Sequence, residues 1–136
     1  NKGYCEFVFE TEFEPHERGV ILTEKINKPL KHLNPFVIAG TSGSLEVLKS
    51  FGFQTFDKWW DESYDTVNDP VEKIEKINNL FLELSNWSHD KWCTTLKEMR
   101  TILAQNYYVY YRIHTQAEYL KGIEKYIDNF VAKNDK

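Results

Sequence analysis

The chain has 136 residues, of which 41% are hydrophobic and 28% charged, and its formal net charge at pH 7 is −4. This length suits a single domain with a hydrophobic core of its own. The acidic balance argues against a general nucleic-acid binder, and no run of about 18 apolar residues is present to span a membrane. The first residues, NKGYCEFVFE, show no signal-peptide pattern and no initiator Met, so we expect a fragment of a longer protein.

Cysteine and histidine usage predicts a reducing compartment and no metal site. Cys5 falls in a strand pattern and Cys93 in a helix pattern, without a spacing motif, which predicts two free, buried thiols in the cytoplasm. The histidines stand apart, without the spacing of metal ligands; they are His16, His32, His89 and His114. No Cys–His pair, serine triad or pair of catalytic carboxylates follows from the spacings, so we name no catalytic residue.

The first part of the chain begins with a strand pattern and then a helix pattern. Aromatic and β-branched residues predict a strand from Tyr4 to about Glu10, and charged, turn-forming residues follow at 14–19. Thr23 suits the N-cap of a helix. Apolar residues then recur at helical spacing, at Ile26, Leu30 and Leu33. Because Pro29 removes one helical hydrogen bond, we expect this helix to be short or kinked.

The next segments repeat the alternation of strand and helix. The run NPFVIAG, residues 34–40, is continuous and apolar, which is typical of a buried strand in a parallel sheet. Small residues at 41–44 predict a turn, residues 45–51 a helix that stops at Gly52, and residues 53–56 a third, short strand. Strands that alternate with helices predict an α/β fold with a short parallel sheet.

The remainder of the chain changes character. Residues 57–69 are acidic, aromatic and irregular, and a helical period of apolar residues then covers 71–84. Ser88 suits the cap of another helix that continues to residue 116, and residues 117–133 read as a final amphipathic helix. We predict a single domain with an α/β part at 1–66 and a helical part at 67–136.

The triplet Thr23-Glu24-Lys25 stands where the apolar residues 20–22 meet the predicted helix. One interpretation is a capped helix start with a Glu and a Lys on the surface. The other is an anion site, because a helix N-terminus offers unpaired backbone N–H groups and Lys25 adds a positive charge. Glu24 can accept hydrogen bonds from vicinal sugar hydroxyls, so this second interpretation suits a sugar–phosphate ligand.

Two further segments each allow a structural and a functional interpretation. The turn between the second strand and its helix either connects the two elements or approaches a ligand through its backbone N–H groups. Its residues are Gly40, Thr41, Ser42, Gly43 and Ser44. The segment WWDESYD, residues 59–65, either closes over the core or contacts a ligand through Trp59, Trp60 and Tyr64. Its carboxylates also allow a metal, although no calcium-loop pattern is present.

An aromatic stripe occupies NYYVYYRIH, residues 106–114. In a helix Tyr107, Tyr110 and Tyr111 share one side with His114, and we expect that side to pack against the sheet or a second subunit. Stacking on RNA would need more positive charge than Arg112 supplies.

Taken in order, FETEF, ILTEKINKPL and NPFVIAG resemble the donor-binding region of fucosyltransferase-type glycosyltransferases. The matching residues are Phe9-Glu10-Thr11-Glu12, Thr23-Glu24-Lys25 and Pro35-Phe36-Val37-Ile38-Ala39-Gly40. The later GFQTFDKWWDESYD is similar to a segment of uncharacterised phage and marine relatives. The resemblance covers about residues 5–65. This chain departs from the family pattern at Thr11-Glu12, at Pro29 and in its helical C-terminal third.

The resemblance implies a two-domain GT-B architecture with facing Rossmann-like halves, and this chain would be the C-terminal, three-layer half. It implies a nucleotide-sugar substrate, typically a guanosine diphosphate sugar, without a further cofactor. Glu24 would hold ribose hydroxyls and Lys25 the diphosphate, with Thr23, Glu10 and the 40–43 turn beside them. The acceptor site and the catalytic base would lie mainly on the N-terminal half of such an inverting transferase, so this chain alone would show little or no turnover.

A second class of function remains open at this point, a non-enzymatic α/β interaction module. Aromatic residues make up 15% of the chain, and the helical C-terminal third lacks a counterpart in the transferase pattern. Apolar surface left exposed by such a module would favour a homodimer.

Overall fold

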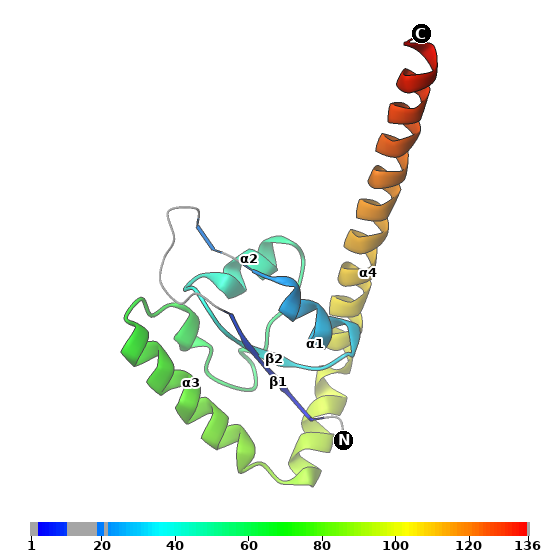
Figure 1. The fold of residues 1–136 in the computed structure, drawn as a ribbon. Coiled ribbons are helices and arrows are strands. Elements are labelled where there is room, and N and C mark those ends of the chain that lie inside the picture. The colour runs from blue at the N-terminus through cyan, green and yellow to red at the C-terminus, as the bar shows by residue number, and fades with distance from the viewer. Residues whose placement is uncertain (1–2, 11–18, 21, 136) are drawn as a thin grey trace.

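A computed structural model describes residues 3–10, 19–20 and 22–135 of the chain. Thr11, Glu12, His16 and most of the turn predicted at 14–19 lie outside the described residues. The helices and strands, in chain order, are β1 (Glu6–Phe9), η1 (Glu24–Ile26), α1 (Asn27–Lys31), β2 (Phe36–Ala39), α2 (Ser44–Ser50), η2 (Ser63–Asp65), α3 (Pro70–Ser85) and α4 (His89–Asn134), where η marks a 3-10 turn. This is a mixed α/β fold, as predicted (Figure 1).

The sheet of the described residues consists of β1 and β2, which pair in parallel with Glu6 opposite Phe36 and Phe9 opposite Ala39. Every residue of β2 is buried, so the predicted buried parallel strand is confirmed. In Figure 1, α3 lies along one side of the two strands, and α1 and α2 lie on the other. Both strands therefore end at the same edge of the sheet, close to the turn that leads into α2.

The third strand predicted at residues 53–56 is wrong, because this segment forms no strand. The backbone N–H of Gln54 donates to Asn106 Oδ1 at 2.8 Å, and its carbonyl accepts from Asn106 Nδ2 at 2.9 Å. Asn106 is a buried residue of α4. Its amide satisfies the two backbone groups that a neighbouring strand would otherwise pair, so the segment docks on a helix instead.

The helix predicted after Thr23 is short, as its proline suggested. Thr23 caps η1 by accepting a hydrogen bond from the Lys25 N–H at 3.4 Å, and α1 adds only five residues around Pro29. Leu33 was expected on the buried face of this helix. It instead follows the helix with a φ of 58° and lies exposed, because the chain turns there in the left-handed conformation.

The cap predicted at Ser88 is confirmed, and Asp69, which was not predicted as a cap, begins α3. Asp69 accepts from the Val71 N–H at the start of α3, and Ser88 accepts from the Lys91 N–H at the start of α4. The division into two helices near residue 116 is wrong, since α4 runs without a break. Gln116 and Ala117 both favour helix, so nothing in the sequence stops the helix there. The second half of α4 leaves the body of the protein (Figure 1).

The core lies between the sheet, the loop that follows α2, and the helices α3 and α4. Its largest fully buried side chains include Phe36, Phe56, Tyr64 and Met99. Phe36 and Phe56 meet edge to face with ring centroids 5.1 Å apart. Within the described chain, no helix combines the length and the apolar character needed to cross a membrane.

Candidate functional site

The candidate site lies at the edge where β1 and β2 end. Glu10 follows β1 and Gly40 follows β2, and the Glu10 N–H donates to the Ala39 carbonyl at 2.8 Å. A Cβ atom on Gly40 would lie 3.1 Å from both Cβ and Cγ of Glu10. The two strand ends thus approach so closely that a side chain at position 40 would press on Glu10, and Glu10 lies beside the turn at 40–44.

The carboxylate of Glu10 ties the start of η1 to the end of β1. The side chain is only 5% exposed. Its Oε1 accepts from the Thr23 N–H at 3.2 Å, and its Oε2 accepts from Thr23 Oγ1 at 2.7 Å. A buried carboxylate needs such partners to offset its lost hydration. Both polar groups of Thr23 are therefore bonded within the chain.

Glu24 and Lys25 lie on the surface beside this corner. Lys25 Nζ donates to the Phe9 carbonyl at 2.8 Å, which holds the ammonium at the end of β1. Glu24 lies at a cavity of about 300 Å³ between η1, α2 and α4. Phe51 and Tyr110 also line this cavity. The lining of this cavity includes Thr23 and Glu24 but not Lys25, so the cavity lies beside the Thr23 corner and extends from it towards α4.

The turn at 40–44 is held by Asp65 from η2. The Gly43 N–H donates to the Asp65 carbonyl at 2.9 Å, and the Leu45 N–H donates to Asp65 Oδ2 at 3.1 Å. Ser42 Oγ donates to the Val67 carbonyl, while Thr41 is buried. The N–H groups of Gly43 and Leu45, where the turn leads into α2, are thus bonded within the chain.

A buried lysine from α3 completes the corner. Lys73 is 1% exposed, and its Nζ donates to the Gly40 carbonyl at 2.6 Å. Burial raises the pKa of the Asp65 carboxyl, while the Leu45 amide and the Lys73 charge lower it. Burial lowers the pKa of Lys73, and the charge of Asp65 raises it. Lys73 was missed by sequence analysis, although it shares the helix face of Ile77 and Leu84.

The aromatic side chains of the loop at 59–65 pack mainly in the core. Trp60 and Tyr64 are 4% and 1% exposed. Trp59 is half-buried, and its Nε1 donates to Glu98 Oε2 of α4 at 2.9 Å. Burial also raises the pKa of the Glu62 carboxyl, which accepts from the Phe56 N–H. The structure does not bring these three rings to the strand ends where Glu10 and Lys25 lie.

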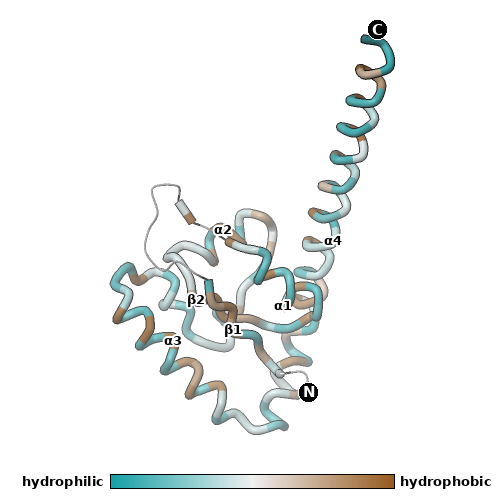
Figure 2. Tube along the Cα trace, viewed as in Figure 1, coloured by the Kyte–Doolittle hydropathy of each residue, from teal (hydrophilic) through white to brown (hydrophobic). Residues whose placement is uncertain are grey.

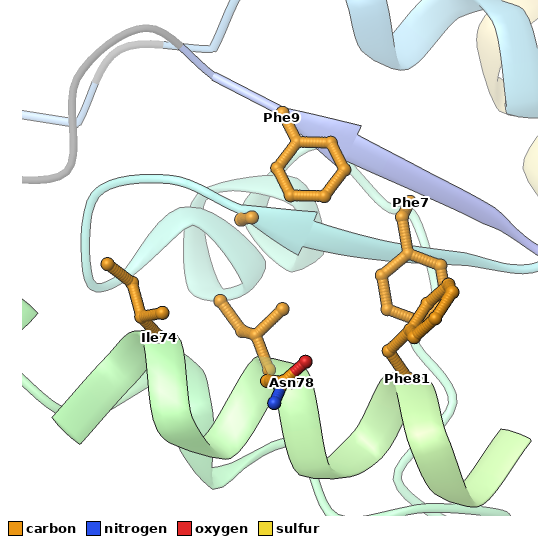
Figure 3. A pocket seen from close by; sticks show the side chains of 7 residues that line it. Phe7, Phe9, Ile74, Asn78 and Phe81 are labelled. Carbon is orange, nitrogen blue, oxygen red and sulfur yellow. The ribbon is translucent and has the colours of Figure 1, made fainter. Parts of the chain in front are cut away.

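A second cavity lies on the α3 side of the same edge, with a volume of about 280 Å³ (Figure 3). Phe7 and Phe9 of β1 face Ile74 and Phe81 of α3 across it. Asn78 supplies an amide to a wall that is otherwise apolar. The sequence pattern had placed Ile74 and Phe81 on the buried face of α3, yet both remain about half exposed here.

A contact between three side chains far from this edge was also missed. Tyr4 OH is hydrogen-bonded to His89 Nδ1, and Cys93 Sγ lies 3.5 Å from His89 Nε2. The spacing of His89 and Cys93 places them one helical turn apart, which is the signal that could have found the pair. Burial raises the pKa of the other thiol, Cys5, to about 12.

The aromatic stripe of α4 packs only in part. Tyr107 and Tyr111 remain exposed, while Tyr110 packs against the core and its ring centroid lies 4.3 Å from that of His114.

Among the described residues, no group of three or more His, Cys, Asp or Glu side chains converges to hold a metal ion. No protein-family model, curated protein or solved structure matches this chain.

Proposed function

We propose that the carboxyl edge of the β1–β2 pair binds a nucleotide-sugar, as the donor site of an inverting glycosyltransferase. The observation that carries this proposal is the convergence of Glu10, Thr23, Lys25 and Gly40 at that edge. In open α/β sheets the carboxyl ends of the strands are where ligands bind. The more specific proposal of a nucleotide-sugar ligand is supported by the order of the motifs along the chain, which resembles that of fucosyltransferase-type glycosyltransferases.

Lys25 is the group that would hold the diphosphate. An ammonium has three donor protons, and one of them contacts the Phe9 carbonyl, so two remain for phosphate oxygens. Positive charge fixed beside a departing nucleoside diphosphate stabilises the charge that develops as the sugar leaves. Because Asp65 bonds the N–H groups of Gly43 and Leu45, the proposal gives the 40–44 turn the role of shaping the site rather than of cradling phosphate.

The cavity beside Glu24 would take the nucleoside. Its volume of about 300 Å³ is at the lower end of the range for small-molecule sites. The rings of Phe51 and Tyr110 can stack against a base, and the Glu24 carboxylate at the cavity can accept from the two ribose hydroxyls. Glu10 would act indirectly, since it fixes the Thr23 corner from which Glu24 and Lys25 extend.

The proposal also assigns this chain a place in a larger enzyme. It would be the Rossmann-like, three-layer half that binds the donor, and the acceptor and the catalytic base would come from a second half. We therefore expect binding of a guanosine diphosphate sugar without sugar transfer by residues 1–136 alone. The site is therefore tested by measuring ligand binding to this chain and not by measuring sugar transfer.

Calorimetric titration with guanosine diphosphate tests the site. The wild-type chain is expected to bind at up to millimolar ligand, and Lys25→Ala to bind at least about tenfold more weakly, a loss of about 1.4 kcal/mol. Lys28→Ala is the matched control, because Lys28 is an exposed lysine that pairs with Glu6 and not with the strand ends. Absence of binding by the wild type at millimolar ligand would overturn the assignment, as would an equal loss in Lys28→Ala.

A further inference from the structure

The second half of α4 is an unpartnered helix. Beyond Ile113, which is half-buried against the core, every described residue of α4 is exposed. Figure 1 shows this half extending away from the body, and it reaches Asn134. At about 1.5 Å per residue it is roughly 30 Å long. Because most helical stability in proteins comes from the packing of an apolar face, another surface is expected to pack on this half.

Apolar side chains form a regular stripe along this projecting half. Ile113, Leu120 and Ile127 recur every seven residues, and Ile123 and Phe130 recur three residues after the last two. This alternation of three and four residues is the heptad pattern of a coiled coil. Tyr119, Tyr126 and Val131 border the stripe. Figure 2 shows hydrophobic segments recurring between hydrophilic ones along this part of α4.

The stripe is large enough for a specific interface. Its side chains from Tyr119 to Val131 are between 38% and 72% exposed. A fully exposed aromatic side chain presents about 150–250 Å², so seven partly exposed apolar side chains offer roughly 700 Å² in one copy and 1,400 Å² in two. Stable protein–protein interfaces bury about 1,200–2,000 Å² in total, so two stripes facing each other reach that size.

The charges of the projecting half favour a second copy over a membrane surface. Residues 113–134 carry three acidic side chains, Glu118, Glu124 and Asp128, and three basic ones, Lys121, Lys125 and Lys133. Their formal charges sum to zero, so two copies of this helix do not repel each other. Helices that lie on anionic membranes instead carry a basic polar face.

We propose that α4 pairs with α4 of a second copy of this chain through the stripe from Ile113 to Phe130, forming a short two-stranded coiled coil. Gln116 and Asn134 occupy the two polar positions of the heptad pattern at either end of the apolar stretch. Polar residues at such positions restrict the register of paired helices. Ile113, where the stripe begins, also lines the cavity beside Glu24. Leu120, Ile123, Ile127 and Phe130 line neither cavity of the candidate site, so the pairing is tested at residues from this part of the stripe.

Sedimentation analysis of the full chain, from micromolar to millimolar concentration, tests this pairing. The wild type is expected to shift from monomer to dimer across that range. The double variant Leu120→Glu/Ile127→Glu is expected to stay monomeric, with dimerisation weakened at least about tenfold. The matched control, Thr115→Glu/Asn129→Glu, adds the same charges away from the stripe and is expected to form dimers as the wild type does.

Two controls keep the result interpretable. Because Leu120 and Ile127 are exposed in the monomer, the tryptophan fluorescence of the core and the Tm of the monomeric body should be unchanged in the variant. Vesicles of phosphatidylcholine with phosphatidylserine are expected not to bind the chain. A wild type that stays monomeric at millimolar concentration, a variant that still forms dimers, or a monomer that binds these vesicles would each overturn the proposal.

Discussion

Replacement of Lys73 by methionine is the sharpest test of how the candidate site is held in place. Methionine keeps the aliphatic stem and nearly the same volume, so the change removes the ammonium without opening a cavity. The ammonium is buried and donates a hydrogen bond to the Gly40 carbonyl at 2.6 Å. Its loss leaves that carbonyl without this donor and the buried Asp65 without its cationic neighbour.

The expected cost follows from these two losses. A hydrogen bond to a charged group contributes about 1.5–3 kcal/mol, and the lost attraction between the Lys73 charge and Asp65 adds to this cost. Asp65 keeps its hydrogen bond from the Leu45 N–H, so the expected loss is at the upper end of that range, at about 3 kcal/mol of unfolding free energy. For a chain of this size that is roughly a 10 °C fall in Tm.

The pH dependence carries a signature that distinguishes this cause from poor packing. The folded-state pKa of Asp65 is raised above its ordinary value of 3.8, so its favourable contribution is full below that value and is lost as the pH rises through the folded-state pKa. Removal of Lys73 raises that pKa further. The difference in stability between the wild type and Lys73→Met is therefore expected to grow as the pH rises above 3.8, the ordinary pKa of an aspartate.

Urea unfolding at several pH values, followed by tryptophan fluorescence, measures both effects. Adding Asp65→Asn to Lys73→Met is expected to recover part of the loss at neutral pH, because the uncompensated carboxylate is removed. A loss below about 1 kcal/mol in Lys73→Met would refute the reasoning. So would a loss that does not change with pH, or strict additivity of the two substitutions.

Two further outcomes follow from the structure. Gly40→Ala is expected to lower the free energy of unfolding by about 1–3 kcal/mol, since its Cβ would press on Glu10. Gly122→Ala, on the open surface of α4, is expected to raise helix stability by up to about 1 kcal/mol. Thermal melts that rank the two variants in the opposite order would contradict both expectations. Iodoacetamide at pH 8 is expected to modify Cys93, whose thiol lies beside His89. It is expected to spare Cys5, because a pKa raised to about 12 leaves almost no thiolate at that pH. Equal labelling of the two cysteines in mass spectra would contradict this expectation.

Much of the local structure could be predicted because it depends on neighbouring residues. Thr23, Asp69 and Ser88 each cap a helix through a hydrogen bond to an amide two or three residues ahead. The uninterrupted apolar run before Gly40 predicted β2, since only a strand covered on both faces tolerates it. These features need no knowledge of distant contacts.

The failures concern contacts between residues far apart in the chain. The segment at 53–56 has the composition of a strand, yet Asn106 satisfies its backbone from more than fifty residues away. Lys73 was not singled out from the sequence, and only the fold shows that it donates to the Gly40 carbonyl and that the charge of Asp65 acts on it. The sequence pattern predicted two helices where α4 runs without a break from His89 to Asn134.

The candidate site was predicted in part for the same reason. The meeting of Glu10 with Thr23 and Gly40 follows from two parallel strands that end together, which the order of motifs indicated. The sequence did not show that Asp65 accepts hydrogen bonds from the N–H groups of Gly43 and Leu45, between β2 and α2. Lys25 and Glu24, both on the surface, are consequently the groups on which the proposed ligand depends.

The most direct test of the donor-site proposal is an NMR titration of the ¹⁵N-labelled chain with a guanosine diphosphate sugar. The proposal predicts saturable shifts of the backbone amides of Glu10, Glu24 and Lys25 and of the turn that follows Gly40. It also predicts that these shifts disappear in Lys25→Ala and persist in Lys28→Ala. A spectrum that stays unchanged at millimolar ligand, or one whose changes are confined to the projecting half of α4, would contradict it.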